Sequence, residues 1–384
     1  MEHSFHLDNL AYGEQSSQQV LGACPHDCPD TCSIITTVNN GLAVKVQGNP
    51  HHPNTNGVLC NKVSKYTERT YHKDRVLTPL KRVGAKGEGL FEAVSWEEAL
   101  KDVATRLNAL VATNPLAILP YSYGGTLGAV QGDSISERIF NYLGTSDLDR
   151  TICASAGAEG MTYTLGAKLG TKVEQFANSD LIIIWGSNSI TSNLHFWRYA
   201  QEAKRKGAKL ICIDPRKTET ADKCHQHIAI LPGTDAALAL AIMHQLISNN
   251  DLDHDYIQNY TLGFEMLRQE AMAWSPEKAA LVCGITAQEI IDLAQEYGAC
   301  LRNNKAAAIR LNYGMQRTKG GGNAVRAVLS LPALIGAWRH AAGGALLSSS
   351  SANVARSAAL QRPDLAKVQR RVINMTTIGD DLLK

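Results

Sequence analysis

The sequence contains no apolar run long enough to form a membrane helix. Its densest run, residues 181–185, has the length of a strand, whereas a membrane helix needs about 18–20 apolar residues. The N-terminal segment also lacks the basic stretch, the apolar stretch and the twin arginine of export signals. These absences predict a cytoplasmic protein without membrane spans.

An excess of charge of one sign is absent as well. The 384 residues include 38 Lys and Arg against 36 Asp and Glu, a formal net charge of +2. No basic face is therefore indicated, and nucleic acid is disfavoured as the main partner. Hydrophobic residues make up 44% and charged residues 19%, a composition that argues against disorder and predicts two or three folded domains.

Cysteine is scarce but unevenly distributed. Nine cysteines are too few for a disulfide scaffold in a chain of this length. The first sixty residues nevertheless contain four: three with the spacing C-x3-C-x3-C, and a fourth after 27 further residues. Four thiolates in a turn-rich segment can bind a 4Fe–4S cluster, one cysteine per iron. A structural zinc site, which typically uses C-x2-C pairs, and plain buried thiols are the alternatives.

The remainder of the chain alternates short apolar strands with helices. Uniformly apolar strands in such a pattern predict an α/β fold with doubly wound parallel sheets. Near the N-terminus, Asn39-Asn40-Gly41 predicts a β-hairpin, and Ser95 with Glu98 predicts a capping box that begins a helix. Strands are expected at residues 117–121, 180–185, 209–213, 227–231 and 306–311, and helices at 196–206, 236–248 and 322–338.

Polar or glycine-rich loops follow these strands, at the edge where ligands bind in such sheets. The loop 186–189 allows close backbone approach and offers amide and hydroxyl donors for a phosphate. Asp235 can either cap the helix that follows it or hold a base. Each loop alone is weak evidence, because turn glycines and capping aspartates are common structural devices.

Several segments resemble the N-terminal part of the molybdopterin oxidoreductases, the dimethyl-sulfoxide-reductase superfamily. They are CPHDCPDTC and GVLCNK around the four cysteines, followed by RVLTPLKRVG and FEAVSWEEAL. The resemblance runs from about residue 22 to residue 338. It implies a molybdenum or tungsten ion held by two pterin guanine dinucleotides, and a 4Fe–4S cluster on Cys24, Cys28, Cys32 and Cys60.

The resemblance also implies roles for single residues. Cys153 would ligate the metal, since a soft thiolate suits a dithiolene-bound ion, and Lys62 would lie between cluster and pterin. Arg326 matches an active-site arginine of formate dehydrogenases, with a structural ion pair as the alternative. The dinucleotides would be held by Gly186, Ser187, Asn188, Ser189, Asp214, Arg216, Gly233, Thr234, Asp235, Met315 and Gln316.

The implied activity is a two-electron oxidation or reduction of a small molecule. The cluster would pass single electrons to a redox protein or an electron-transfer subunit. Ala154 stands where formate dehydrogenases have a histidine after the metal ligand, which disfavours formate oxidation, so formate dehydrogenase is only a further alternative. Cys212 and Cys224 match no ligand position and are expected to be ordinary buried residues.

Three parts are expected along the chain: a flexible arm over residues 1–21, a cluster module over 22–78 and an α/β region over 79–384. The sequence ends before the C-terminal barrel-like domain that the resemblance implies, and no packed element is expected after the serine run at 348–351. We therefore expect the chain alone to bind bis-pterin molybdenum weakly. A truncated, non-catalytic iron–sulfur or zinc-binding module is the alternative from a different class.

Overall fold

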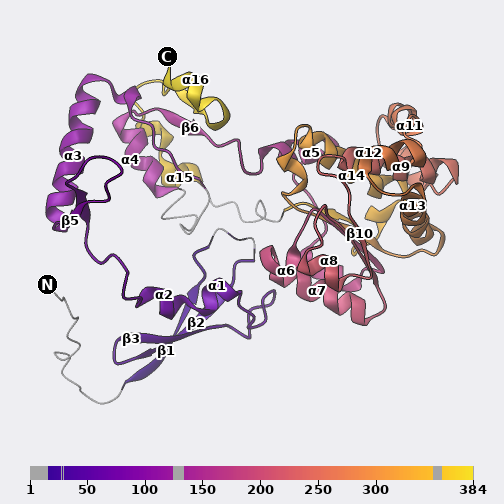
Figure 1. Cartoon of the computed structure of the whole chain (residues 1–384), viewed down its shortest axis with the longest axis horizontal. Coiled ribbons are helices and arrows are strands. Elements are labelled where there is room, and N and C mark those ends of the chain that lie inside the picture. Colours follow the sequence, from indigo (N-terminus) through magenta and orange to yellow (C-terminus); the bar gives the residue numbers. More distant parts are fainter. Residues whose placement is uncertain (1–15, 27, 29, 124–133, 349–356, 384) are drawn as a thin grey trace. The chain divides into compact units, whose positions relative to one another are not determined.

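The computed structural model describes residues 16–26, 28, 30–123, 134–348 and 357–383 (Figure 1). Most of the predicted arm and most of the serine run at 348–351 lie outside these residues. The chain forms two compact units, one of residues 1–148 and 355–373 and the other of residues 149–354 and 374–384. Among the described residues, no helix is both long enough and apolar enough to span a membrane.

An antiparallel sheet begins the first unit, in the order β1 (Ser17–Ala23), β2 (Ser33–Asn39), β3 (Leu42–Gly48). Asn40 and Gly41 have φ of 50° and 80°, which suits a two-residue hairpin turn. The hairpin prediction is thereby confirmed. The prediction of an arm through residue 21 is wrong from Ser17 onward, because β1 is held by backbone pairing with β2. All its side chains are exposed, so no burial pattern marks it in the sequence.

Short helices and a long exposed one follow in the first unit. In α3 (Trp96–Thr113) the Ser95 hydroxyl accepts the amide of Glu98, as predicted, but the Glu98 carboxylate pairs with Lys81 at 3.4 Å. The strand predicted at 117–121 is wrong: a 3-10 turn, η2 (Pro115–Ala117), ends at its first residue, because Pro115 starts a turn, and residues 118–121 form no strand. The other elements are α1 (Asn61–Ser64), α2 (Tyr66–Thr70), β4 (Leu80–Arg82), β5 (Phe91–Ala93), α4 (Ile135–Leu143) and β6 (Asp147–Asp149).

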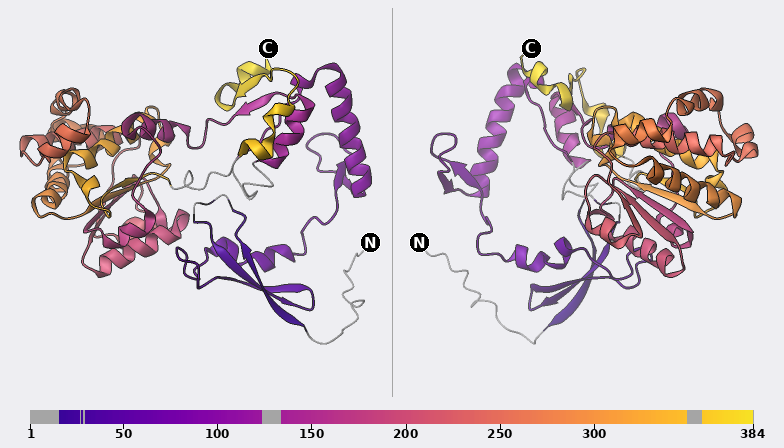
Figure 2. Two further views of the ribbon diagram at one scale, coloured as in Figure 1. Left: turned by 180° about the vertical axis from the view of Figure 1, so that it is seen from behind. Right: turned by 45° about the vertical axis from the view of Figure 1, so that its right-hand side comes forward.

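The C-terminal segment returns to the first unit, contrary to the expectation that no packed element follows the serine run (Figure 2). Arg370 explains the docking, since its guanidinium donates to the carbonyls of Thr145 at 2.7 Å and Ser146 at 2.9 Å. These contacts join residues far apart in sequence, so no local pattern could indicate them. The elements are α15 (Ser357–Gln361), η7 (Pro363–Leu365) and β12 (Val372–Asn374), followed in the second unit by η8 (Met375–Thr377) and α16 (Ile378–Leu382).

A five-stranded parallel sheet forms the centre of the second unit, in the order β11-β10-β7-β8-β9. The chain runs from β7 outward through β8 to β9, then returns to the other side of β7 for β10 and β11. This reversal makes the fold doubly wound, as predicted, with its topological switch point between β7 and β10. The strands are β7 (Leu181–Trp185), β8 (Lys209–Ile213), β9 (Gln226–Ile228), β10 (Ala307–Leu311) and β11 (Gly344–Leu346).

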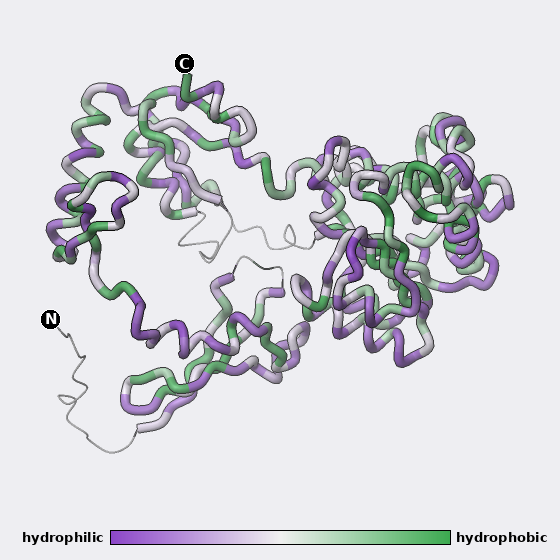
Figure 3. The backbone as a smooth tube through the Cα atoms, in the orientation of Figure 1, coloured by the Kyte–Doolittle hydropathy of each residue, from purple (hydrophilic) through white to green (hydrophobic). Residues whose placement is uncertain are grey.

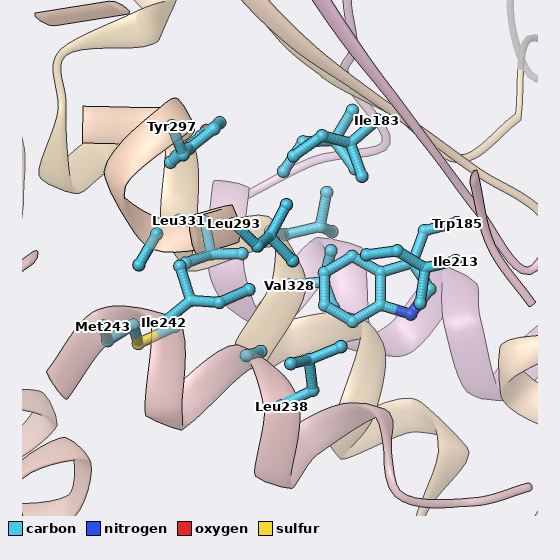
Figure 4. Packing of buried hydrophobic residues seen from close by; sticks show 14 of the residues in the cluster. Ile183, Trp185, Ile213, Leu238, Ile242, Met243, Leu293, Tyr297, Val328 and Leu331 are labelled. Atoms are coloured by element: carbon cyan, nitrogen blue, oxygen red, sulfur yellow. The ribbon is translucent and has the colours of Figure 1, made fainter. Parts of the chain in front are cut away.

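Helices cover both faces of this sheet. On one face, Ile182 and Ile184 pack with Phe196 of α7 (Leu194–Arg205). On the other face, Trp185 packs with Leu238 of α9 and Val328 of α14 (Figure 4). The strands β7 and β10 are fully buried, and much of the interior of this unit is coloured as hydrophobic in Figure 3. The second face is covered by α9 (Asp235–Ser248), α13 (Ala287–Arg302) and α14 (Gly321–Leu334). Between α9 and α13 in the sequence, the chain forms three further helices, α10 (His254–Tyr260), α11 (Phe264–Met272) and α12 (Pro276–Cys283).

Candidate functional site

The first three module cysteines lie in the loop that connects β1 to β2. The Cys24 amide donates to the Cys32 carbonyl at 2.9 Å, directly after the last strand pair of Ala23 and Ser33. The loop between them turns sharply: the Cys28 amide donates to the His26 carbonyl at 2.9 Å. The strand ladder therefore brings the two ends of the C-x3-C-x3-C segment together.

The fourth cysteine is returned to this loop by the segment after β3. The Asn49 amide donates to the Ser33 carbonyl at 2.9 Å, which places the segment beside the base of the cysteine loop. Gly48 and Gly57 approach so closely that a Cβ at Gly48 would collide with the Gly57 carbonyl. Cys60 then occupies the N-cap position of α1, as expected for a fourth ligand brought back by the chain.

The thiols influence one another electrostatically. Burial raises the pKa of Cys24, and Cys32 and Cys60 raise it further, whereas the Lys62 ammonium acts in the opposite direction. Burial, with Asp30 as the next cause, raises the pKa of Cys28 to about 12. Without a positive partner these thiols stay protonated, so binding of a cationic iron–sulfur centre must release protons.

A buried hydroxyl also fits a cluster at this site. The Tyr66 hydroxyl has no hydrogen-bond partner within the described part of the chain. Burial raises its pKa, and the charges of Cys24 and Cys60 contribute to the shift. A donor in this position can hydrogen-bond a thiolate or sulfide, which is how surrounding residues stabilise metal–sulfur centres.

Single-ion geometry is not seen here. In the described ranges, no group of three or more His, Cys, Asp or Glu side chains is arranged to hold one metal ion. A zinc ion draws all its sulfurs to one atom, whereas a 4Fe–4S cluster takes one thiolate per iron and needs them further apart.

Two glycines bring the loops after β7 and β10 together at the switch point. Gly186 has φ of 63°, and a Cβ on it would lie 3.3 Å from the Met315 nitrogen. A Cβ on Gly314 would lie 2.9 Å from the Gly186 carbonyl oxygen. Only glycine suits both the left-handed φ and the close approach. Such loops at the carboxyl ends of neighbouring strands form the usual ligand crevice of doubly wound sheets.

Buried hydroxyl and amide groups fill the loop after β7. The hydroxyls of Ser187 and Ser189 lie 2.9 Å apart, and the Asn312 amide donates to Ser187 at 3.3 Å. Asn188 is fixed from the other side, since the Thr220 hydroxyl donates to its Oδ1 at 2.9 Å. The structure thus brings together the predicted phosphate loop and adds Asn312 and Thr220, which the sequence did not single out.

Cys153 precedes α5 (Ser155–Leu165) and is tied to the switch-point loop by two neighbouring side chains. Gln316 Oε1 accepts the Gly157 amide at 2.5 Å. Arg317 donates to the Ile152 carbonyl at 2.8 Å, and its Nη2 lies 3.9 Å from Cys153 Sγ. Gln316 Nε2 is buried without a partner in the described part of the chain, so it offers a free donor that fits a bound acceptor group.

Arg317 was missed by the sequence reasoning, which chose Arg326 instead. Arg326 lies over the Tyr163 ring, 5.9 Å from its centroid, on the exposed side of α14. The signal for Arg317 was its position next to Gln316 in a loop already selected. Its contact with Cys153 joins positions 164 residues apart, which no local pattern reveals.

The remaining predicted loop residues lie at or near the strand ends, and their contacts differ from one residue to the next. Asp214 Oδ1 accepts the Arg216 amide at 3.0 Å. Asp235 is buried and accepts the Trp185 indole at 2.8 Å; burial raises its pKa, and the indole bond acts in the opposite direction. Gly233 has φ of 82°, and the Thr234 hydroxyl donates to the Leu231 carbonyl at 2.7 Å. Nucleotide binding by these residues stays a prediction.

Comparisons with known proteins agree with this geometry. A family described as "Molybdopterin oxidoreductase" matches residues 75–378, and its "Fe4S4 domain" matches residues 18–72. These matches confirm the predicted cofactor classes, a 4Fe–4S cluster and a molybdenum-bearing molybdopterin.

Individual relatives extend the same picture. The "Probable oxidoreductase YoaE" of Bacillus subtilis is 40% identical over 97% of this chain and 55% of its own length. Dimethyl sulfoxide reductase DmsA of Escherichia coli is 31% identical over 86% of this chain and 45% of its own length. The structure of acetylene hydratase from Pelobacter acetylenicus is similar to this chain, with a TM-score of 0.66 and 26% sequence identity. The similarity covers 83% of this chain and 43% of the hydratase chain. The chain spans about half the length of the curated relatives it matches.

Proposed function

Because this chain belongs to the molybdopterin oxidoreductase family, we propose that it carries the cluster-binding and central portion of a molybdenum/iron–sulfur oxidoreductase. Its substrate is a small molecule that gains or loses two electrons. The molybdopterin, when bound, supplies the two-electron redox chemistry, and the protein supplies binding, orientation and electrostatics.

The cysteine loop would bind the electron-relay centre. Cys24, Cys28, Cys32 and Cys60 are the ligands, and the Tyr66 hydroxyl donates to a sulfur nearby. The exposed Lys62 in α1 opposes the rise that burial causes in the pKa of Cys24, so its cation favours negative charge at this centre. A redox protein or electron-transfer subunit would then take up or deliver single electrons.

The switch point would hold the molybdopterin. Cys153 is the metal ligand, since it lies beside the loops after β7 and β10. Gly186 has no side chain, so phosphate oxygens can approach its backbone closely. The Gln316 amide donates to a polar acceptor of the cofactor. The other dinucleotide contacts are assigned to Ser187, Asn188, Ser189, Asp214, Arg216, Gly233, Thr234, Asp235 and Met315.

The substrate remains a class rather than a compound. Ala154 cannot move a proton, so formate oxidation is the alternative reaction rather than the leading one. Arg326 on α14 or Arg317 beside Cys153 can bind an anionic substrate by two parallel hydrogen bonds. The distance of 3.9 Å between Arg317 and Cys153 favours Arg317 for this role.

One observation carries the proposal: the segment of Cys153 is hydrogen-bonded to the switch-point loop through Gln316 and Arg317. These two long-range bonds fix the backbone of Ile152 and Gly157, on either side of Cys153, at the ligand crevice. This position supports the proposal, because a soft sulfur ligand there would lie where doubly wound sheets bind dinucleotides.

Elemental analysis of anaerobically purified protein tests the proposal. Iron, zinc, molybdenum and tungsten are counted per chain after expression with cofactor supply. We expect about four iron atoms and no zinc, with molybdenum or tungsten below one per chain because the chain alone is expected to bind it weakly. Zinc in place of iron would contradict the cluster assignment.

Matched variants separate the two sites. Cys60→Ser should lose iron, and Cys153→Ser should lose molybdenum but keep iron, whereas Cys300→Ser should change neither. Molybdenum that is indifferent to Cys153→Ser would overturn the ligand assignment. Iron without any molybdenum would favour the alternative of a non-catalytic iron–sulfur module.

A further inference from the structure

A strongly positive segment follows the fourth cysteine of the module. Residues 61–75 contain five Lys and Arg against two Asp and Glu, a net charge of +3, whereas the whole chain has only +2. The cations are Lys62, Lys65, Arg69, Lys73 and Arg75, and all five are exposed. The last four are called the basic face below. The near-neutral charge of the whole chain conceals this local excess.

The protein does not neutralise these cations itself. In the part of the chain that the structure describes, none of the five forms an ion pair with a carboxylate. Of the two acidic residues in the segment, Asp74 lies 3.8 Å from His72 instead, and Glu68 is exposed. By contrast, Lys81 further along the chain pairs with Glu98 at 3.4 Å. Unpaired charges of one sign add up to a field that attracts a surface of the opposite sign.

A short helix and the turn after it bring the basic face together. Lys65 caps the start of α2 and Arg69 lies near its end, a spacing of four residues that places helical side chains on one face. Tyr66 of the same helix is half-buried, so α2 turns a different face toward the rest of the module. The Arg75 amide donates to the His72 carbonyl at 3.0 Å. This tight turn keeps the last two cations next to the end of α2.

The same segment is attached to the sheet that carries the cysteine loop (Figure 1). Cys60 is the N-cap of α1, directly before the basic segment. The Tyr66 ring of α2 lies 5.7 Å from the His26 ring of the cysteine loop, measured between centroids. After α2, the Tyr71 hydroxyl accepts the Ala43 amide of β3 at 3.0 Å. The basic face therefore lies on an element that is fixed against the proposed cluster ligands.

Apolar side chains beside these cations favour a protein as the partner. Tyr71, Val76 and Leu77 are 54%, 65% and 63% exposed, within and directly after the basic segment. Protein–protein interfaces combine aromatic and apolar contacts with a polar rim, whereas nucleic acids are bound chiefly through phosphate contacts. The mixture of apolar and positive side chains fits an acidic protein surface.

We propose that the basic face is the docking surface for an acidic one-electron carrier protein. This inference rests on the proposed cluster, and it adds which surface the redox partner contacts and the sign of the partner's charge. A carrier docked here loses one electron as the cluster gains one, or the reverse, so no bond forms or breaks. Complementary charge chiefly speeds the encounter and makes it depend on salt.

Binding of a plant-type ferredoxin, an acidic iron–sulfur protein, to the whole chain tests this surface. Isothermal titration calorimetry under anaerobic conditions gives the dissociation constant at ionic strengths of about 0.1 M and about 1 M, where the screening length is about 10 Å and about 3 Å. We expect binding at the lower ionic strength and a loss of about tenfold or more at the higher one. Absence of binding at about 0.1 M would overturn the proposal.

Charge reversal locates the surface. Lys65→Glu/Arg69→Glu/Lys73→Glu should weaken ferredoxin binding about tenfold or more at the lower ionic strength, because like charges then face each other. If this variant does not fold, Lys65→Gln/Arg69→Gln/Lys73→Gln replaces it and should weaken binding by a smaller factor. Affinity equal to that of the wild type would overturn the assignment of this surface.

A matched control separates local charge from net charge. Lys172→Glu/Lys305→Glu/Lys367→Glu makes the same change in net charge at three exposed lysines outside α1 and α2, none of which forms an ion pair in the described ranges. Its affinity should stay within about twofold of the wild type, because distant charges are screened. Equal weakening in both triple variants would overturn the proposal.

Two further measurements identify the partner class and separate this inference from the proposed function. A short DNA duplex should bind weakly, and tight DNA binding that the basic-face variant loses would overturn the choice of a protein carrier. Iron per chain is measured on the same samples. Wild-type protein without iron would contradict the proposed cluster, whereas iron-loaded protein that does not bind ferredoxin would contradict the docking surface alone.

Discussion

The cysteine loop of the first unit and the switch point of the second are built by opposite means. Around the loop, β1 has no buried residue and Cys24, Cys28 and Cys60 are only half-buried. At the switch point, β7 and β10 are completely buried. One site lies on a thin hairpin sheet, and the other lies at the edge of a large apolar core.

This difference indicates where each site obtains its rigidity. The loops at the switch point stand on an apolar sheet that is stable by itself, since buried apolar area stabilises in proportion to its extent. The cysteine loop has little apolar support beyond Cys32, Ile34 and Val63. It must therefore gain much of its order from the metal centre that it binds.

Replacing Trp185 should have the largest effect on the second unit. The indole is fully buried in the core and donates to the buried Asp235. Trp185→Ala should lower the free energy of unfolding by about 3–5 kcal/mol, because a cavity forms and Asp235 loses its donor. Urea denaturation followed by circular dichroism gives the value.

Trp96→Ala is the matched control in the first unit. That indole is 67% exposed on α3, so its loss should change stability by less than about 0.5 kcal/mol. Similar losses in the two variants would contradict the comparison, because the second unit would then not depend on its core more than the first.

Iron removal should have an intermediate effect, confined to the cysteine module. Exposed Lys45 and Lys62 provide tryptic sites there, and exposed Lys305 provides one in the second unit. Stripping the cluster should speed cleavage at the module sites about tenfold, which corresponds to roughly 1.4 kcal/mol of lost stabilisation. Timed digestion with mass spectrometry follows each site.

Cleavage after Lys305 serves as the internal reference. Its rate should stay constant, because the sheet of the second unit does not depend on the cluster. If both regions are cleaved faster, the two units share their stability, and if neither is, the module is ordered without metal. Either result would break the contrast between the sites.

The sequence predicts four of the five strands of the parallel sheet, namely β7, β8, β9 and β10. β8 begins and ends at the predicted residues, Lys209 and Ile213, because an apolar run is bounded by Gly207 and Asp214. β11 was missed because Gly344–Leu346 is only three residues long and starts with a glycine at φ of 94°. Short strands of this kind depend on a neighbouring strand rather than on their own pattern.

The sites were predictable to a different extent. The cysteine spacing favours a cluster and leaves zinc and plain buried thiols as alternatives, and the family resemblance strengthens the cluster, because all four cysteines lie within one short module. The surroundings of Cys153 could not be worked out in this way, since Arg317 reaches it across 164 positions.

The smallest expected effect concerns the edge of the second unit, where polar contacts replace apolar ones. Asp253 caps α10 by accepting the Tyr256 amide at 2.8 Å, and Arg339 donates to it at 2.7 Å. Asp253→Ala should cost about 1 kcal/mol of unfolding free energy at neutral pH. The value is well below that for Trp185 because a capping bond is replaced in part by water.

The pH dependence of this loss distinguishes charge from capping. The Arg339 hydrogen bond, aided by the Tyr256 amide, lowers the pKa of Asp253. The stabilisation is therefore complete above the unfolded value of about 3.9 and is lost as pH falls through the lower folded value. Urea denaturation across this range should show that the free energies of unfolding of the wild type and Asp253→Ala become equal as the pH falls.

Asp253→Asn keeps a capping oxygen, so it should lose less unfolding free energy than Asp253→Ala at neutral pH. A deficit of Asp253→Ala that is constant with pH would show that the carboxylate charge contributes nothing.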